Sequence, residues 1–259
     1  MGKADVVDYV SCCGCDLVQQ FPIPADVSSY YEAYPVHQEK TAFYTAVRRK
    51  IMAGVYTSPK RWPEKCKILD FGCGDGWYLK WCQEYGHRCV GFEQNPEHAQ
   101  TLSKKLAIDV FSDFQKLAAQ HSDGFDVITL HFVVEHLTDI RSILAGIASL
   151  LRKGGQLRFV VPNINSWEYR LFGHKWHSLD APRHISFVGE PHARGLARDF
   201  GLSFGAEHAV GFPNGFGGSL PTVLLGHFSS LFFLLTLPLS VLITRMFPSG
   251  NMAYTLYRD

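Results

Sequence analysis

The sequence lacks the charge imbalance and the leader segment that would place it in several classes of protein. Its 25 lysine and arginine residues nearly balance its 24 aspartates and glutamates, giving a formal net charge of +1. No overall field therefore draws it to nucleic acid. The first ten positions carry acids and no apolar run, which predicts no signal peptide and makes a cytoplasmic protein the expectation. We also find no internal repeat, which argues against a solenoid.

Cysteine is too scarce for a disulfide framework, and its seven residues are an odd number. Four of the seven lie in segments that resemble the strands and helices of a core, namely Cys66, Cys73, Cys82 and Cys89. This usage favours a reducing compartment over disulfide pairing. The 259 residues, 46% hydrophobic and 19% charged, suffice for one sizeable core with appendages and argue against disorder.

Three regions of the chain differ in character. Residues 1–63 are loop-rich and aromatic, and within them Glu39 to Val55 is expected to be helical. Residues 64–210 alternate short apolar runs with longer amphipathic segments. Residues 211–259 begin with glycine and proline, continue as an apolar stretch and close with a strand-like piece, Asn251 to Tyr257. We therefore expect an N-terminal extension, a main domain, and a C-terminal insertion whose final strand returns to that domain.

The middle region predicts a doubly wound α/β domain with a mostly parallel sheet. Apolar runs ended by glycines predict strands, and the amphipathic segments between them predict helices. The expected strands are Lys67 to Phe71, Arg88 to Glu93, Phe125 to His131, Gln156 to Val161 and Ser203 to Val210. The expected helices are Trp77 to Tyr85, Pro96 to Leu106, Asp139 to Leu151 and Pro191 to Phe200.

A glycine-rich loop follows the first of these strands. The run from Ile68 to Gly76 reads Ile-Leu-Asp-Phe-Gly-Cys-Gly-Asp-Gly, and a helix is expected directly after it. Glycines there let the backbone approach a ligand at the carboxyl edge of the sheet. A dinucleotide loop would place its third glycine at Trp77, and Asp70 and Asp75 would repel a pyrophosphate. A cationic ligand without phosphate would not be repelled.

Together with a second acid, this loop resembles class I S-adenosylmethionine-dependent methyltransferases. Glu93 ends the next strand, at the spacing of a carboxylate that accepts hydrogen bonds from ribose hydroxyls. Asp113, the strand from Phe125 to Ile128, and the run from Leu150 to Gly155 then follow in the family's order. The resemblance covers Lys67 to about Val210 and, more weakly, the last strand.

The resemblance implies a Rossmann-like, seven-stranded methyltransferase sheet with an apolar helical insertion before the last strand. It also implies S-adenosylmethionine as the cofactor. The cofactor contacts it assigns are Asp70, Gly72, Gly74 and Gly76 at the methionine end, Glu93 at the ribose, Asp113 with Phe114 at the adenine, and His131. For Asp113 a second interpretation is equally open, because an aspartate directly before a helix can cap it. An NAD-binding Rossmann domain, or a methyltransferase-like fold that has lost its cofactor, is the alternative for the whole domain.

Three histidines follow strands where the chemistry is expected. Methyl transfer from a sulfonium is an in-line displacement, and an oxygen nucleophile usually needs a base such as histidine. His184, in a Pro-Arg-His loop after the fifth strand, is the first candidate for this base, with a loop-stabilising hydrogen bond as the alternative. His131 is expected to contact cofactor or substrate and is the second candidate. His136 is expected only to tie a loop to a helix, while Arg183 and Lys175 either bind an anionic group or are surface charges.

No metal is expected at the catalytic site. The Glu-His pair at positions 135–136 and the Pro-Arg-His loop resemble a methyltransferase subgroup that acts on small molecules, including sugars and quinone precursors. Related quinone-pathway enzymes carry an extra acid three residues before this glutamate, and some are thought to use a divalent metal. Phe132 stands at that position here, which argues against a catalytic metal.

A cysteine turn near the start resembles half of a zinc module. Cys12 and Cys15 have zinc-knuckle spacing, and some sugar methyltransferases carry two such knuckles before a segment like Phe21 to Pro24. Four ligands close a structural zinc site, and the sequence shows no upstream pair. We therefore expect a degenerate module without metal. A zinc site completed by Cys13 and a histidine such as His37 is the alternative.

The apolar stretch near the end has no formal charge over the 22 residues from Val223 to Thr244. It is long enough to span a bilayer, but a single pass would leave the last strand on the wrong side of the membrane. Pro238 also divides it, so two short helices forming a hairpin are expected. We expect this hairpin, within residues 221–247, to touch a membrane interface, with a substrate cap, a homodimer contact or a packed helical layer as alternatives.

The sequence thus predicts a cytoplasmic S-adenosylmethionine-dependent methyltransferase, peripheral on the cytoplasmic face of the membrane. Its acceptor is expected to be a small molecule, glycan-related or lipid-linked, with O-methylation ahead of C- or N-methylation. No nucleic-acid partner is expected. The competing hypothesis is a non-catalytic, membrane-associated binding module that retains the fold.

Overall fold

The computed structural model describes residues 7–24, 27, 49–52 and 55–259. The helix expected over Glu39 to Val55 falls mostly outside these residues, and positions 49–52 are helical. His37, the histidine considered for a zinc site, also lies outside them.

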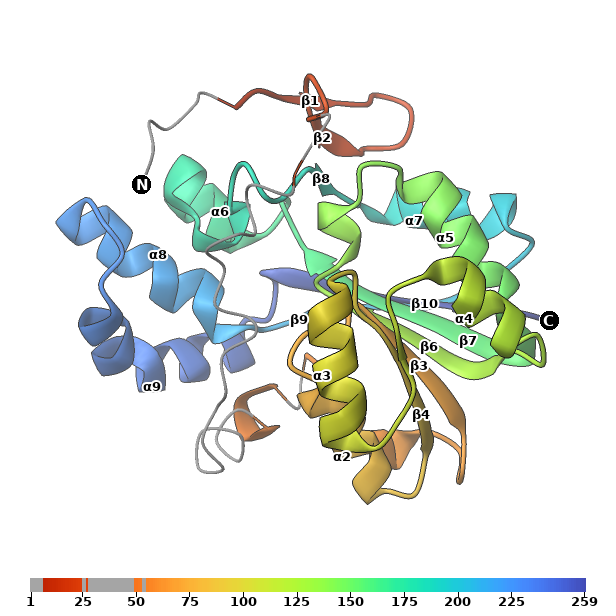
Figure 1. Ribbon diagram of the computed structural model, residues 1–259. Coiled ribbons are helices and arrows are strands. Elements are labelled where there is room, and N and C mark those ends of the chain that lie inside the picture. Colours follow the sequence, from red (N-terminus) through yellow and green to blue (C-terminus); the bar gives the residue numbers. More distant parts are fainter. Residues whose placement is uncertain (1–6, 25–26, 28–48, 53–54) are drawn as a thin grey trace.

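A seven-stranded sheet forms the centre of the molecule, in the order β5-β4-β3-β6-β7-β10-β9 (Figure 1). Its strands are β3 (Lys67–Phe71), β4 (Arg88–Phe92), β5 (Val110–Phe111), β6 (Phe125–His131), β7 (Leu151–Pro162), β9 (Ser203–Val210) and β10 (Asn251–Tyr257). Strands β3 to β7 pair in parallel, and β10 lies antiparallel between β7 and β9. The predicted doubly wound α/β fold with seven strands is confirmed.

Strand β7 begins earlier than the sequence predicts. The preceding helix, expected to continue to Leu151, ends at Ser149, and Gly154 and Gly155 lie inside β7 instead of stopping the helix. A Cβ on Gly155 would lie 2.8 Å from the carbonyl oxygen of Arg152. The pairing of β7 with β6 shifts register in this stretch, so these glycines permit a strand irregularity.

Helices cover both faces of the sheet. One face packs against α4 (Phe114–Gln120), α5 (Ile140–Ser149) and α7 (Glu190–Asp199). The other packs against α2 (Trp77–Glu84) and α3 (Pro96–Leu106). Because neighbouring residues of a strand point to opposite faces, Leu69 belongs to the first core and Ile68 to the second.

The N-terminal segment forms a small second sheet over the loop that follows β7. It contains β1 (Tyr9–Ser11), β2 (Val18–Gln20) and β8 (Ser186–Phe187), in the order β1-β2-β8. The Gln20 N–H donates to Ile185 O at 2.7 Å, and the Tyr9 hydroxyl donates to His184 O at 2.7 Å. The extension therefore holds the backbone around His184.

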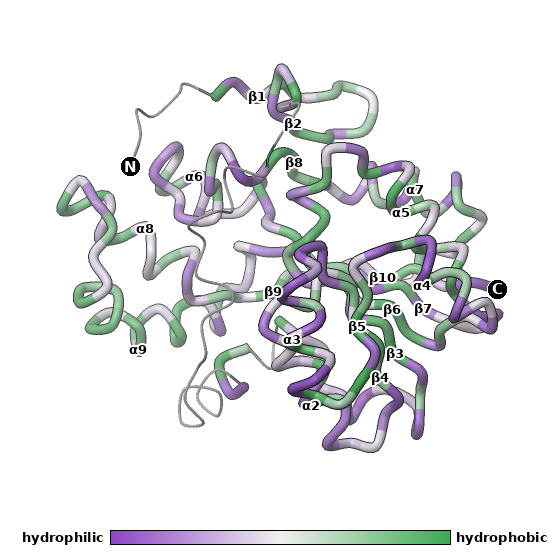
Figure 2. Tube along the Cα trace, viewed as in Figure 1, coloured by the Kyte–Doolittle hydropathy of each residue, from purple (hydrophilic) through white to green (hydrophobic). Residues whose placement is uncertain are grey.

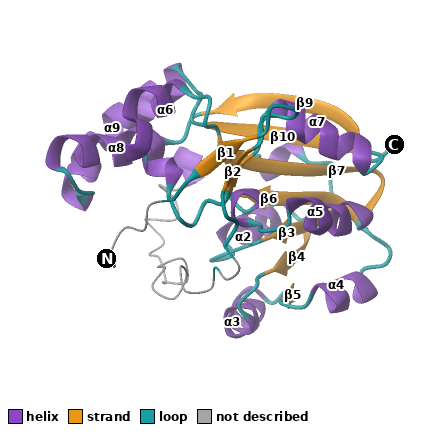
Figure 3. Cartoon of the chain, turned by 90° about the horizontal axis from the view of Figure 1, so that it is seen from above, coloured by secondary structure: helices purple, strands orange, loops and turns teal. Residues whose placement is uncertain are grey.

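The C-terminal insertion is a hairpin of two helices, α8 (Pro213–Leu225) and α9 (Ser230–Met246). It stands beside α6 (Trp167–Phe172), away from the sheet (Figure 3), and much of it is hydrophobic (Figure 2). Two helices are present, but the predicted break at Pro238 is wrong, since Pro238 lies within α9 and the chain turns at Gly226, which has φ +78°. Among the described helices, none is long and apolar enough to cross a membrane.

Candidate functional site

The glycine loop turns at the carboxyl end of β3 through three left-handed residues. Gly72, Gly74 and Gly76 have φ of +76°, +54° and +72°, a conformation that side chains other than glycine rarely adopt. A Cβ on Gly72 would lie 2.5 Å from Val133 Cγ2, and one on Gly76 would lie 2.7 Å from Leu106 Cδ1. The loop therefore requires glycine at these positions.

Glu93 supports this loop from the end of β4. One carboxylate oxygen accepts a hydrogen bond from Gly74 N at 3.2 Å, and the other accepts from Asn95 N at 3.2 Å. Glu93, directly after β4, thus lies beside the glycine loop, as the spacing predicts. A carboxylate here is placed to accept hydrogen bonds from a diol that lies across the loop.

Asp70 and His131 meet beneath the loop. The buried Asp70 carboxylate accepts from Thr129 Oγ1 at 2.7 Å, and His131 Nδ1 lies 3.4 Å from the same oxygen. Burial lowers the pKa of His131, and the nearby Asp70 carboxylate partly opposes this shift. The remaining ring nitrogen of His131, Nε2, is buried without a hydrogen-bond partner among the described residues.

An aromatic wall closes the space above His131. The ring of Tyr56 stacks on His131 with centroids 3.9 Å apart, and Tyr78 meets the same histidine edge-on at 4.7 Å. Trp77 packs against Tyr56 at 4.7 Å. Sequence reasoning missed Tyr56, because no motif in the N-terminal region indicates which residue reaches the edge of the sheet.

Backbone strain marks the end of β6. Phe132, directly after His131, has φ +58°, which costs energy in a bulky residue and is found more often at functional sites. The short helix η4 (Val134–His136) follows at once. This geometry turns the chain so that residues 135 and 136 face the loop after β7.

Glu135, His136 and His184 form the second polar group at this edge. One possible ligand atom from each lies within 4.8 Å of the others. The two imidazole rings meet edge-on with centroids 4.7 Å apart. Both carboxylate oxygens of Glu135 are buried without a hydrogen-bond partner in the part of the chain that the structure describes. The sequence offered the Glu-His pair and His184 separately, and only the fold brings them together.

Burial sets the charge state of this group. It raises the pKa of Glu135 to about 8 and lowers the pKa of His136 to about 3, with the neighbouring His184 also lowering the latter. Burial likewise lowers the pKa of His184 to about 3. At neutral pH the two rings are therefore uncharged, and Glu135 is mostly protonated unless a cation compensates its charge.

The histidine rings are oriented by backbone carbonyls. His136 Nδ1 lies 2.9 Å from Arg183 O, and His184 Nδ1 lies 2.9 Å from Ser178 O. If each Nδ1 carries the proton, each Nε2 carries a lone pair, which is the tautomer of both a general base and a metal ligand. Two nitrogens and a carboxylate are a donor set that fits a divalent cation. The prediction of no catalytic metal stays a prediction.

Other predicted contacts have more local partners. Asp113 caps α4, its Oδ1 accepting from Gln115 N at 2.9 Å and Lys116 N at 3.2 Å. The helix-capping interpretation is therefore confirmed, and an adenine contact by Asp113 stays a prediction. Arg183 forms an ion pair with Asp180, which partly neutralises its charge.

The cysteine turn between β1 and β2 lies against α7. His192 Nδ1 is 3.4 Å from Cys15 Sγ. Because His192 is 177 residues away along the chain, the spacing of the cysteines could not identify it as their neighbour. Over the described ranges, only Glu135, His136 and His184 gather three such donors. The expectation of a degenerate module without zinc stays a prediction.

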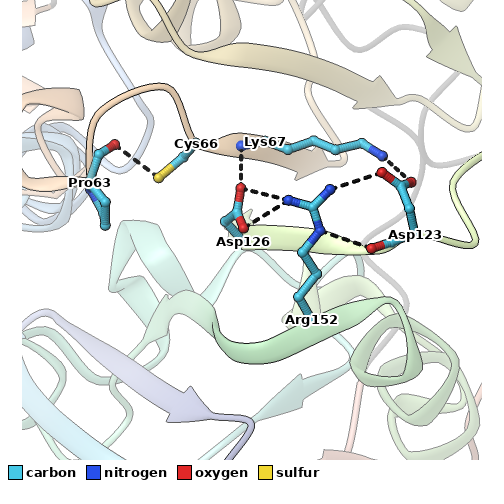
Figure 4. A network of polar contacts seen from close by, with 6 residues as sticks. All are labelled: Pro63, Cys66, Lys67, Asp123, Asp126 and Arg152. Atoms are coloured by element: carbon cyan, nitrogen blue, oxygen red, sulfur yellow. Dashed lines mark hydrogen bonds and ion pairs between the residues drawn. The ribbon is translucent and has the colours of Figure 1, made fainter.

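The amino edge of the sheet, by contrast, carries a paired network of charges (Figure 4). Arg152 donates from Nη1 to Asp126 at 3.0 Å and from Nη2 to Asp123 at 2.9 Å. The Lys67 backbone N–H donates to Asp126 at 2.7 Å, and its ammonium group pairs with Asp123. These contacts tie the starts of β3, β6 and β7 together.

Comparison with known proteins gives a family match across the sheet and its helices. A family model described as a methyltransferase domain matches residues 43–204. The ubiquinone biosynthesis O-methyltransferase of Cronobacter sakazakii is 31% identical over 116 residues, covering 41% of this chain and 47% of that protein. That of Klebsiella pneumoniae is 30% identical over 105 residues, covering 38% and 43%. The aligned parts span less than half the length of these curated relatives.

Solved structures share the fold at low sequence identity. A protein from Pyrococcus horikoshii OT3 superposes with a TM-score of 0.55 and 14% identity, covering 90% of this chain and 100% of that one. An S-adenosylmethionine dependent methyltransferase from Mesorhizobium loti gives 0.54 and 14%, covering 80% and 98%. At these identities the likeness shows the fold alone.

Proposed function

Because this chain belongs to the methyltransferase domain family, we propose that it transfers the methyl group of S-adenosylmethionine to an oxygen of a small-molecule acceptor. The observation that carries the proposal is the loop of three left-handed glycines held against Glu93 at the carboxyl edge. This edge combines close backbone approach with carboxylates. It suits a cationic nucleoside and disfavours the pyrophosphate of NAD.

The residues of this edge have separate tasks toward the cofactor. When bound, S-adenosylmethionine supplies a methyl group made electrophilic by its sulfonium sulfur. The glycine loop meets its methionine end, and Glu93 accepts hydrogen bonds from its ribose. The Asp70 carboxylate, which lies against the His131 ring on which Tyr56 and Tyr78 pack, favours the sulfonium charge.

We place the general base at His184. During transfer the acceptor oxygen bonds to the methyl carbon, the carbon–sulfur bond breaks, and the hydroxyl proton passes to the base. His184 Nε2 can accept this proton when Nδ1 donates to Ser178 O. A ring whose pKa is lowered to about 3 is a weak base, so it suits an acidic hydroxyl, such as that of a phenol or enol. His131 is the second candidate for the base.

The group of Glu135, His136 and His184 also fits a divalent cation. Held there, the cation would lower the pKa of an acceptor hydroxyl directly. The unpartnered carboxylate of Glu135 is the observation that favours this second route. Sensitivity of turnover to a chelator separates the two routes.

The choice of acceptor class rests first on the relatives, and the lowered pKa of His184 agrees with it. Two curated relatives are named for O-methylation in ubiquinone biosynthesis, and a phenolic acceptor suits the chemistry of His184. A quinone-like or lipid-linked phenol is therefore the first choice, and a glycan-related hydroxyl the second. Amine and carbon acceptors rank after these.

The test is S-adenosylhomocysteine release from purified protein. S-adenosylmethionine is supplied with phenols, sugars and amines in turn, with and without a chelator. We expect release with phenols first, and acceptors that co-purify with the protein can be identified by mass spectrometry and added to the panel. Cofactor binding without release for any of these acceptors would favour the non-catalytic binding module.

A further inference from the structure

The helical hairpin α8–α9 presents its large apolar side chains to the outside. Of the described exposed large hydrophobic residues, most lie between positions 223 and 247. Those of α9 recur every three or four residues, so they form one stripe along the helix. The stripe consists of Leu231, Leu234, Leu235, Leu239, Leu242 and Met246, and Leu235 is 72% exposed.

The inward side of the hairpin combines small and hydroxylated residues with Phe233, whose ring lies at Gly217. Ser240 and Thr244 are the buried residues of α9. Their hydroxyls donate to carbonyls one turn earlier in the same helix, at 2.9 Å and 2.7 Å. A Cβ on Gly217 would lie 2.6 Å from Ser240 Oγ, and one on Gly211 would lie 1.9 Å from Thr244 O. Gly217 thus lets α8 approach α9 closely at Ser240, and Gly211, just before α8, lies against Thr244.

This arrangement is the reverse of a helix pair in a water-soluble core. Such a pair buries its leucines and exposes its polar residues. Helices that contact lipid instead pack through small residues, satisfy hydroxyls internally and turn leucine outward. Thr236, Ser240 and Thr244 repeat at the four-residue spacing of this packing.

We propose that the hairpin α8–α9 docks on a lipid bilayer interface, with its leucine stripe inserted among the acyl chains. The charges fit this partner. Between Glu207 and Asp259 the sequence contains no acid, and Arg245, at the C-terminal end of α9, is the one charged residue from 208 to 257. No carboxylate therefore has to leave water when the stripe enters the interface.

The hairpin is joined to the loop that carries His184, the proposed base. Ser219 of α8 accepts from the His177 backbone N–H at 2.8 Å. The ring of His177 stacks on Phe228, at the turn of the hairpin, with centroids 5.4 Å apart. The helix η6 (His177–Leu179) leads straight into the turn from Asp180 to His184. Docking would therefore hold this turn at the membrane surface. If the proposed function holds, on which this step rests, the acceptor is a molecule that partitions into the bilayer.

The docking test is flotation with phosphatidylcholine vesicles, with and without phosphatidylglycerol. Intact protein is compared with the double variant Leu235→Asp/Leu239→Asp and with Tyr85→Asp. The control replaces an exposed aromatic residue outside the hairpin by the same acid. We expect intact protein and the Tyr85 control to float with both lipids, because one arginine gives little dependence on anionic lipid. The double variant should lose more than about tenfold in partitioning, since burying one leucine is worth at least that factor.

Each other outcome of this test contradicts docking. Intact protein that stays monomeric and does not float overturns the proposal. Protein that is dimeric without lipid, and monomeric when the two leucines are replaced, assigns the stripe to a second copy of the chain. Flotation of the double variant would assign binding to another surface. Calorimetry with S-adenosylmethionine on all three proteins, together with circular dichroism, separates these results from misfolding and from failure of the proposed function.

Discussion

The two edges of the central sheet differ in how their polar groups are exposed and partnered. At the amino edge, Lys67, Asp123, Asp126 and Arg152 are matched in donor and acceptor pairs. At the carboxyl edge, both oxygens of Glu135 and the Nε2 of His131 are buried without a hydrogen-bond partner in the described chain.

This difference separates polar groups that hold the fold from those held ready for a ligand. An unmatched buried donor or acceptor is costly, so proteins retain it where an incoming group will supply the partner. The amino edge should therefore govern stability without affecting binding. The carboxyl edge should govern binding and turnover, and some of its groups should lower stability.

The largest effect is expected at the proposed base. Once an acceptor is identified, His184→Ala should lower turnover by roughly 10²-fold or more, with similar cofactor affinity, because only proton removal is lost. Steady-state rates measure this, and His174→Ala, on an exposed ring of the same region, is the matched control. Unchanged turnover in the His184 variant, with His131→Ala impaired instead, would move the base to His131.

A buried acid beyond β7 gives a pH-dependent prediction. Burial raises the pKa of Glu168, on α6, to about 7, and one of its carboxylate oxygens has no partner among the described residues. Between the ordinary pKa of a glutamate and about pH 7, Glu168 therefore keeps its proton in the folded state and loses it in the unfolded chain. As a result, the free energy of unfolding falls as pH rises through that window.

Replacing this acid by its neutral analogue should remove that loss. Glu168→Gln should raise the free energy of unfolding by about 2–3 kcal/mol above pH 8 and change it little near pH 4.5. Urea unfolding at the two pH values measures the difference. An equal change at both would show that Glu168 is not protonated in the folded protein.

A smaller effect is expected where the glycine loop meets its acid. Glu93→Ala should weaken S-adenosylmethionine binding by about 1–3 kcal/mol, because it removes charge-assisted hydrogen bonds to the ribose and the support of Gly74. Calorimetric dissociation constants measure this. Glu97→Ala, an exposed acid in the first turn of α3, should bind like the unaltered protein. An equal loss in both variants would assign the effect to net charge.

The smallest effect is expected at the amino edge. Asp126→Asn should lower the free energy of unfolding by about 1 kcal/mol, because a partly exposed ion pair contributes little and the amide oxygen can still accept from Lys67 N. Cofactor affinity should not change. Weakened cofactor binding in this variant would break the division between the two edges.

Local patterns predicted most elements of the fold, but they did not predict the site's long-range contacts. The bounds of β3, β6, β9 and β10 follow from apolar runs and turn residues, as does the place of the glycine loop. The break of the hairpin was misplaced, because a proline can remain inside a helix when its neighbours satisfy the freed backbone groups. In the site, the stacking of Tyr56 on His131 joins residues 75 positions apart along the chain, which no local spacing encodes.

The partners of His184, the proposed base, show the same limit. The ring of His184 lies beside that of His136, and its backbone carbonyl accepts a hydrogen bond from the Tyr9 hydroxyl. These contacts depend on how the N-terminal sheet packs over the loop. Sequence motifs could name His184 and the Glu-His pair but not their distance. The donor set that fits a cation therefore emerged only from the fold, and the absence of a catalytic metal stays a prediction.

Calorimetric titration of the purified protein with S-adenosylmethionine, S-adenosylhomocysteine and NAD tests the central claim most directly. The carboxyl edge should bind the first two, through the glycine loop and Glu93, and should not bind NAD, whose pyrophosphate meets Asp70 and Asp75. Tight binding of NAD with no response to S-adenosylmethionine would contradict the assignment of this edge.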